Sequence, residues 1–108
     1  MRLLTLAYLA AFSLTSISAA AQEMSEIEWG IDRLGNDFRT IATPRNDPTL
    51  CRNECAADDR CVAWSFVPNR GEFGLCFLKE PRGSDSTVPE ATVNNDVVSG
   101  VKTVVIVE

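Results

Sequence analysis

The sequence predicts a small α+β domain in which one helix lies on antiparallel strands and two disulfides hold the layers together. The chain has 108 residues and four cysteines, and all four follow an export-type first segment. Two cysteines fall on a predicted helix, and the other two fall on the strand-like runs after it. An even number of cysteines in a short exported chain indicates disulfides formed in an oxidising compartment.

Residues 1–21 have the pattern of a signal peptide. Arg2 gives a short positive end, residues 3–17 form a mostly apolar run, and the small residues at 18–21 suit signal peptidase, so we expect cleavage after Ala21. The alternative is a retained anchor, but the run is shorter than the ~20 residues of a spanning helix. We therefore expect a secreted or periplasmic chain with no stable membrane insertion after cleavage.

The mature chain, residues 22–108, is small and acidic. Cleavage removes Arg2 and no acidic residue, so the formal charge of −5 becomes −6. This charge disfavours nucleic acid and anionic membrane surfaces as partners. A chain of this size buries a limited core and often depends on cross-links.

The first elements are predicted from polarity and turn residues. Residues 22–28 are polar, acidic and without a period, which predicts a mobile leader before a domain over 29–108. Gly30, Gly35 and Asn36 interrupt the apolar residues of 29–43, so one or two short strands are expected there.

A capping signal predicts the helix. Asp47 can cap the first turn, Pro48 presets the first helical residue, and the pattern continues to Ala57. Cys51 and Cys55 are four residues apart and so share one face of this helix.

Strand-like runs follow at 61–67 and 73–79, and the residues at 68–71 between them predict a hairpin. The polar stretch 81–89 predicts a loop. A last strand is expected over 97–102, and 103–107 can extend it as an edge strand, which leaves a monomer or a weak dimer open.

The cysteine positions suggest how the disulfides pair. Cys61 opens the first hairpin strand and Cys76 lies inside the second, so a helix across this ribbon can be tied to both strands. Sequence alone leaves three connectivities open. The arrangement favours the nested one, with Cys51 joined to Cys76 and Cys55 to Cys61.

Five motifs occur in order between residues 35 and 102. They are Gly35-Asn36-Asp37-Phe38; Asp47-Pro48 with Cys51-x3-Cys55; Asp58-x2-Cys61-x-Ala63-Trp64-x-Phe66; Cys76-x-Leu78-Lys79; and Ser99-Gly100-Val101-Lys102. In this combination the chain resembles the PAN/Apple domains, especially the short bacterial versions. The resemblance implies a curved antiparallel β-sheet packed around one α-helix, and non-catalytic binding of proteins or carbohydrates. Longer members carry a further disulfide between their ends, which this chain lacks.

Strand alternation suggests a candidate ligand surface. If Cys61 points at the helix, Trp64 and Phe66 turn to the opposite face, and Phe77 of the partner strand faces the same way. Arg70 is expected to be exposed at the hairpin tip. These four residues are the candidate ligand-binding set. The alternative is that the terminal strands or the leader cover the aromatic face as a second core.

Other chemistries find little support. The chain has no histidine, which excludes His-based triads and imidazole metal sites. Zinc is the rival use of the four cysteines, but their spacing differs from zinc knuckles. Asp85, Asn94, Asn95 and Asp96 offer oxygen ligands, yet no calcium-loop motif organises them, so they are read as turn formers. We expect no catalytic residues, metal or cofactor.

The sequence therefore predicts a non-catalytic secreted module that recognises a protein or a carbohydrate. The alternative is an accessory or inhibitory protein that docks on an envelope enzyme such as a protease.

Overall fold

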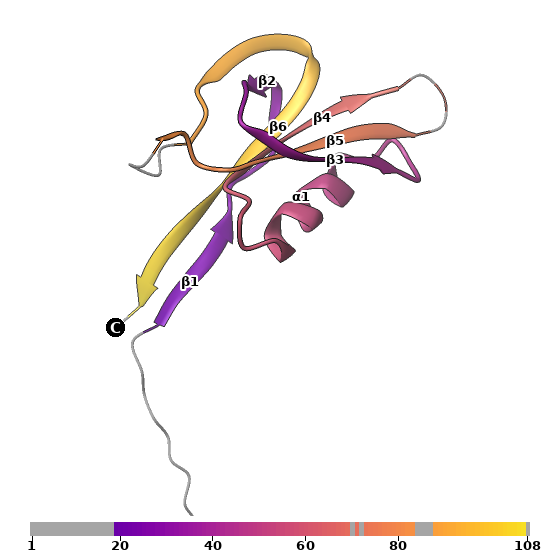
Figure 1. Ribbon diagram of the computed structural model, residues 1–108. Coiled ribbons are helices and arrows are strands. Elements are labelled where there is room, and N and C mark those ends of the chain that lie inside the picture. The colour runs from indigo at the N-terminus through magenta and orange to yellow at the C-terminus, as the bar shows by residue number, and fades with distance from the viewer. Residues whose placement is uncertain (1–18, 70, 72, 84–87, 108) are drawn as a thin grey trace, which may run out of the picture.

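The computed structural model describes residues 19–69, 71, 73–83 and 88–107. The elements are β1 (Ala19–Met24), β2 (Glu28–Arg33), β3 (Asp37–Thr43), α1 (Pro48–Ala57), β4 (Ala63–Pro68), β5 (Gly74–Lys79) and β6 (Ala91–Val107). The strands form one curved antiparallel sheet in the order β1-β6-β4-β5-β3, with β2 also paired to β6, and α1 packs on one face (Figure 1). The predicted α+β fold is confirmed.

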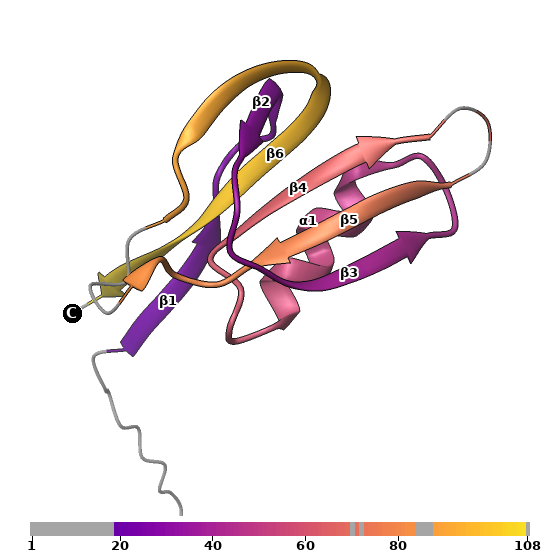
Figure 2. The same cartoon turned by 45° about the horizontal axis from the view of Figure 1, so that its top comes forward.

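Strand β6 connects the parts of the sheet. Along one edge it pairs with β2 through residues 91–99 and with β1 through residues 102–107. Along the other edge only residues 98–101 pair with β4. The ribbon made by β2 and the first half of β6 therefore leaves the sheet as a separate arm, which diverges from β4 in Figure 2. We call this ribbon the β2–β6 arm.

The segment predicted as a mobile leader is mostly part of the sheet. Residues 22–24 lie in β1, Glu28 begins β2, and the backbone of Ser25 between them donates to the carbonyl of Val101 at 2.8 Å. The prediction was wrong because it used composition, whereas the long edge of β6 offers backbone hydrogen bonds to any extended segment. The preceding residues 1–18 lie outside the described part of the chain.

Helix α1 begins with the predicted cap. Asp47 has an extended backbone, and its carboxylate accepts a hydrogen bond from the Thr49 N–H at 3.0 Å. Pro48 occupies the first turn, where its missing N–H removes no intrahelical bond. The buried side chains of the helix are Cys51 and Cys55, which face the sheet.

Both disulfides have the predicted pairing. Cys51 joins Cys76, with 5.3 Å between their Cα atoms, and we call this the helix-to-β5 disulfide. Cys55 joins Cys61 with a Cα separation of 5.2 Å, and we call this the helix-to-β4 disulfide because Cys61 lies just before β4. One ties the first turns of the helix to the sheet, and the other ties its last turn.

The core lies between α1 and the sheet, and it contains two aromatic residues that were predicted to face away. Trp64 pairs with Leu78 and Phe66 pairs with Cys76 across β4 and β5, so all four share the helix face. Trp64 and Phe66 are both 0% exposed. Neither can meet a ligand on the surface.

The error in the predicted face comes from the residue before β4. Val62 lies in a bend, where its N–H donates to the Lys79 carbonyl and its carbonyl accepts from the Lys102 N–H. Alternation counted from Cys61 therefore does not continue into the strand. The residues of β4 that face away from the helix are Ala63, Ser65 and Val67.

Two glycines leave space for these aromatic rings. Gly100 pairs with Trp64 across β6 and β4, and a Cβ at position 100 would lie 2.7 Å from Trp64 Nε1. A Cβ at Gly74 would overlap the ring of Phe66. Trp64 Nε1 is buried and has no hydrogen-bond partner among the described residues.

The end of β2 partly covers the face of the sheet away from the helix. The Ser65 hydroxyl donates to the Asp32 carboxylate at 2.6 Å and accepts from the Arg33 N–H at 3.1 Å. These bonds place the end of β2 over β4. This agrees with the alternative expectation that another segment covers this face of the sheet. The covering contact is polar, however, rather than a second aromatic core.

Candidate binding pocket

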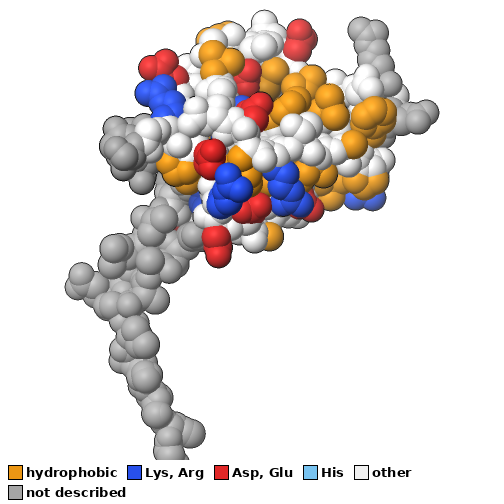
Figure 3. All heavy atoms as spheres, in the orientation of Figure 1, with side chains coloured by type: hydrophobic (Ala, Val, Ile, Leu, Met, Phe, Trp, Pro, Cys, Tyr) orange, Lys and Arg blue, Asp and Glu red, His pale blue; other side chains and the backbone are white. Residues whose placement is uncertain are grey.

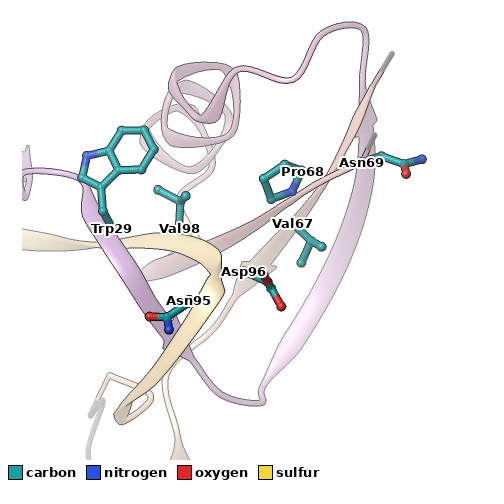
Figure 4. Close-up of a pocket in the computed structure, with 7 residues that line it drawn as sticks. All are labelled: Trp29, Val67, Pro68, Asn69, Asn95, Asp96 and Val98. Atoms are coloured by element: carbon teal, nitrogen blue, oxygen red, sulfur yellow. The ribbon is translucent and has the colours of Figure 1, made fainter. Parts of the chain in front are cut away.

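A pocket lies where the β2–β6 arm diverges from β4, and we call it the fork pocket. Its volume is about 520 Å³. Pockets for small ligands commonly measure roughly 300–1,000 Å³, so this one is large enough to hold a ligand. It is lined by Trp29, Val67, Pro68, Asn69, Asn95, Asp96 and Val98 (Figure 4).

A bulge in β6 forms one wall of the fork pocket. Trp29 pairs with Val98 and Ile31 pairs with Val93, so β6 residues 94–97 face only Gly30 on β2. Gly30 has φ +75°, a backbone conformation that favours glycine. The polar residues at 94–96 were predicted to form a turn, and in the structure they form this bulge within a strand.

A local hydrogen bond shapes the bulge. The Asp96 N–H donates to Asn94 Oδ1 at 3.0 Å, which is the turn geometry that asparagine favours. Regular pairing resumes on both sides of the bulge, and Val97 within it is buried. The side chains of Asn95 and Asp96 are exposed at the rim.

The opposite wall is the end of β4. Beyond Phe66, which pairs with Val98, β4 has β5 as its only strand neighbour within the described residues. Pro68 suits this open edge because proline has no N–H that would need a partner. Asn46 holds the strand end in place, since its Oδ1 accepts from the Asn69 N–H at 2.9 Å and its Nδ2 donates to the Asn69 carbonyl.

Trp29 is the most exposed large aromatic side chain of the described residues, with 68% of its surface accessible. Figure 4 shows its ring beside Val98, across the pocket from Val67 and Pro68. Isolated apolar side chains on a surface are ordinary, but an exposed indole at the rim of a pocket is typical of binding sites. Trp29 is therefore the principal candidate ligand contact.

The sequence analysis did not identify Trp29 as a functional residue. It placed Trp29 only in a short strand, because nothing local shows whether a strand residue is covered. The available signal was its neighbour Gly30 together with the distant polar run at 94–96, and only the pairing of β2 with β6 brings these together.

A second, smaller hollow of about 220 Å³ lies on the face of the sheet away from the helix. Phe77 lines it and is half-buried. The buried Lys79 ammonium also lines it, and it donates to Asp37 Oδ1 at 2.5 Å and to the Gly35 carbonyl at 3.2 Å. This hollow falls below the size range of small-ligand pockets.

The four predicted ligand residues do not form one site. Trp64 and Phe66 are in the core, Phe77 lines the small hollow, and Arg70 lies outside the described residues. Of the three that are described, none lines the fork pocket. The surface predicted from strand alternation is thus replaced by a pocket one strand away.

An ion pair ties together the base of the β2–β6 arm. The Arg33 guanidinium donates to both oxygens of the Glu28 carboxylate, at 2.7 and 3.1 Å, and also to the Pro89 carbonyl at 3.1 Å. The Ser99 hydroxyl adds a third hydrogen bond to Glu28 at 3.0 Å. The bonds from Arg33 lower the pKa of Glu28, and they outweigh the opposing effect of burial.

Four of the other described basic side chains have acidic partners, and two of these ion pairs involve residues near α1. Arg39 bonds Asp58 at 3.1 Å and Arg60 bonds Glu80 at 2.7 Å. Blue and red side chains accordingly lie next to one another in this part of Figure 3. In these pairs the positive charge is therefore partly neutralised by a neighbouring carboxylate.

The described residues contain no group of three or more His, Cys, Asp or Glu side chains placed to bind a metal. The four cysteines are all joined in disulfides. Asp85, one of the oxygen ligands considered for calcium, lies outside the described residues. Within the same part of the chain, no helix is long and apolar enough to cross a membrane.

A comparison with protein families finds one match. The profile described as PAN domain matches residues 31–79, which run from the end of β2 to the end of β5 and contain all four cysteines. No curated protein and no solved structure matches the chain.

Proposed function

Because the chain contains a PAN/Apple-type domain, and such domains are in general protein- or carbohydrate-binding modules, we propose that it is an exported, non-catalytic binding module that uses the fork pocket for recognition. The expected partner is a protein or a glycan. The negative charge argues against nucleic acid.

The exposed Trp29 at the rim of the fork pocket is the observation that carries this proposal. Tryptophan is among the residues that contribute most to binding energy at protein surfaces. The other lining groups are apolar side chains, two amides and one carboxylate. Such groups hold and orient a ligand, and the described lining residues do not include a nucleophile beside a general base, as catalysis of group transfer would require.

Two features support export. The disulfides persist only in an oxidising compartment, and residues 1–21 have the pattern of a signal peptide. Cleavage after Ala21 would remove the first residues of β1 and leave Gln22–Met24, whose partners in β6 are residues 102–104. We therefore place the mature chain in the periplasm or outside the cell.

The test compares three forms of the mature chain on a glycan array and in pull-downs from envelope extract. The forms are the native chain, Trp29→Ala, and the control Val93→Ala, which trims another exposed strand residue that does not line the pocket. We expect the native chain and the control to retain a partner that Trp29→Ala loses. Equal capture by all three forms would contradict recognition at the fork pocket. An enzyme that co-purifies and changes activity, without sugar binding, would identify the accessory role instead.

A further inference from the structure

We propose that the fork pocket binds a neutral sugar, with a pyranose ring stacked on Trp29 and its hydroxyl groups bonded to Asn95 and Asp96. This inference rests on the proposed function, because it names the ligand class of the same pocket.

The apolar part of the pocket suits one face of a sugar ring. The C–H groups of a pyranose form an apolar face that packs against a flat aromatic surface, and the Trp29 indole offers such a surface with 68% exposure. Val98 lies beside the indole, and Pro68 lies across the pocket (Figure 4). A ring stacked on Trp29 would therefore be flanked by apolar atoms, and Asn95 and Asp96 are the polar residues of the same pocket.

The polar part of the pocket suits the hydroxyl groups at the edge of the ring. The Asn95 amide has both donors and acceptors, and the Asp96 carboxylate is an acceptor only, so together they can satisfy neighbouring hydroxyls that donate and accept. Neither side chain makes a hydrogen bond or ion pair with another described residue, although the Asp96 backbone N–H bonds Asn94. Both polar groups are thus available to a ligand.

The charge of the lining selects against acidic sugars. Among the described residues that line the pocket, Asp96 is the one with a charged side chain. Arg33, the basic residue closest along the chain to Trp29, is bonded to Glu28. A uronate, sulfate or phosphate group in the pocket would therefore lie near the Asp96 carboxylate, and this repulsion is unfavourable. A neutral ring meets no such penalty.

The site is held in shape before any ligand arrives. The bulge of β6 lies between two regularly paired stretches of β2, and Asn46 holds the backbone of Asn69 on the opposite wall. A preformed pocket loses little conformational freedom on binding, which matters for a ligand that makes few contacts.

The two tryptophans of the chain provide a direct assay. Trp29 is 68% exposed and Trp64 is 0% exposed, so acrylamide quenches the fluorescence of Trp29 and spares Trp64. We would titrate the mature chain with maltotriose, cellotriose and triacetylchitotriose at millimolar concentrations, with trigalacturonate as the anionic comparison. At least one neutral trisaccharide is expected to shift the emission and to protect Trp29 from acrylamide, and trigalacturonate is expected to do neither.

Variants followed by calorimetry assign the contacts. We expect Trp29→Ala to weaken binding of that trisaccharide by about tenfold or more. Asp96→Asn keeps the shape but loses the charged acceptor, and we expect it to weaken binding by about tenfold. Trp29→Phe should abolish the fluorescence response, because only the buried Trp64 remains. Val93→Ala should bind as the native chain does.

The outcomes separate this inference from the proposed function. If no neutral trisaccharide binds, but the chain captures a protein in a manner that needs Trp29, the sugar assignment is wrong and the binding module stands. If trigalacturonate binds as well as the neutral sugars, the charge argument is wrong. If no partner of any class depends on Trp29, both proposals fail.

Discussion

Replacing Gly100 by alanine tests whether Trp64 is rigidly held in the core. The backbone at position 100 does not require glycine, since Gly100 is not among the residues with positive φ. The added Cβ would nevertheless lie 2.7 Å from Trp64 Nε1, 2.8 Å from Cε2 and 2.9 Å from Cζ2. Carbon atoms prefer separations of about 3.5–4.0 Å, so either the indole or the strand must shift.

The expected size of the effect follows from two opposing terms. Overpacking a tight core costs about 1–3 kcal/mol, and the indole is fully buried against the helix face with little room to move. Replacing glycine by alanine also lowers the conformational entropy of the unfolded chain, and this effect stabilises the folded state by about 0.4–1 kcal/mol. We expect a net destabilisation of about 1–2 kcal/mol, which corresponds to a fall in Tm of roughly 4–15 °C for a domain of this size.

Thermal unfolding with the disulfides intact, followed by far-ultraviolet circular dichroism, measures this loss. A double-mutant cycle with Trp64→Phe supplies the control, because phenylalanine lacks Nε1 and the fused ring that the new Cβ would meet. In that background Gly100→Ala should cost little or should stabilise. An equal cost in both backgrounds would show that the strain arises elsewhere, and no cost in either would show that the core is loosely packed.

Three further predictions concern the ion pair, the helix cap and the disulfides. The pKa of Glu28 is lower in the folded chain than in the unfolded chain, so the stability that Glu28 contributes is present above the unfolded pKa and is lost as the pH falls through the folded pKa. We therefore expect the Tm of Glu28→Gln to fall less steeply than that of the native chain when it is measured from neutral to acidic pH. Asp47→Ala should lower the free energy of urea unfolding by about 1 kcal/mol, and an unchanged midpoint would contradict the role of the cap. Replacing both cysteines of the helix-to-β5 disulfide by alanine should lower the free energy of unfolding by roughly 3 kcal/mol, and the same change at the helix-to-β4 disulfide should lower it by roughly 2 kcal/mol. The difference is expected because the two disulfides close loops of 25 and 6 residues. Equal losses in thermal unfolding would argue against the chain-entropy account.

The parts of the fold that sequence predicted well are set by short-range rules. The cap at Asp47 and the turn preference of proline locate the helix to within one residue, and the spacing of the cysteines on that helix favours the observed disulfides. Each of these depends on residues within one or two turns of each other, or on covalent geometry that admits few solutions.

The parts that were missed depend on strand neighbours far away in the sequence. The bend at Val62 resets the alternation of β4, and it exists because Lys79 and Lys102 bond to its backbone from two other strands. The bulge that forms the fork pocket exists because β2 pairs with β6 on both sides of Gly30. No pattern within a single strand contains this information, so Trp64 was assigned to the wrong face and Trp29 was not identified.

The family match covers only one wall of the fork pocket. Residues 31–79 contain the helix, both disulfides and strands β3 to β5, whereas Trp29, Asn95 and Asp96 lie outside the match. The matched part fixes only one wall of the pocket, the end of β4. The other wall is carried by the β2–β6 arm, and its ion pair and bulge involve neither disulfide.

This division has a physical consequence for specificity. Substitutions at separated sites without shared partners usually have additive effects, so changes in the bulge can alter the ligand without weakening the disulfide-linked core. The arm is held by backbone pairing, by the Arg33–Glu28 ion pair and by the bonds of Ser65 to β2, and none of these uses the side chains of residues 29, 95 and 96. Two chains with the same disulfide-linked core can therefore recognise different ligands. We expect the residues at positions 29, 95 and 96 to determine which ligand is bound.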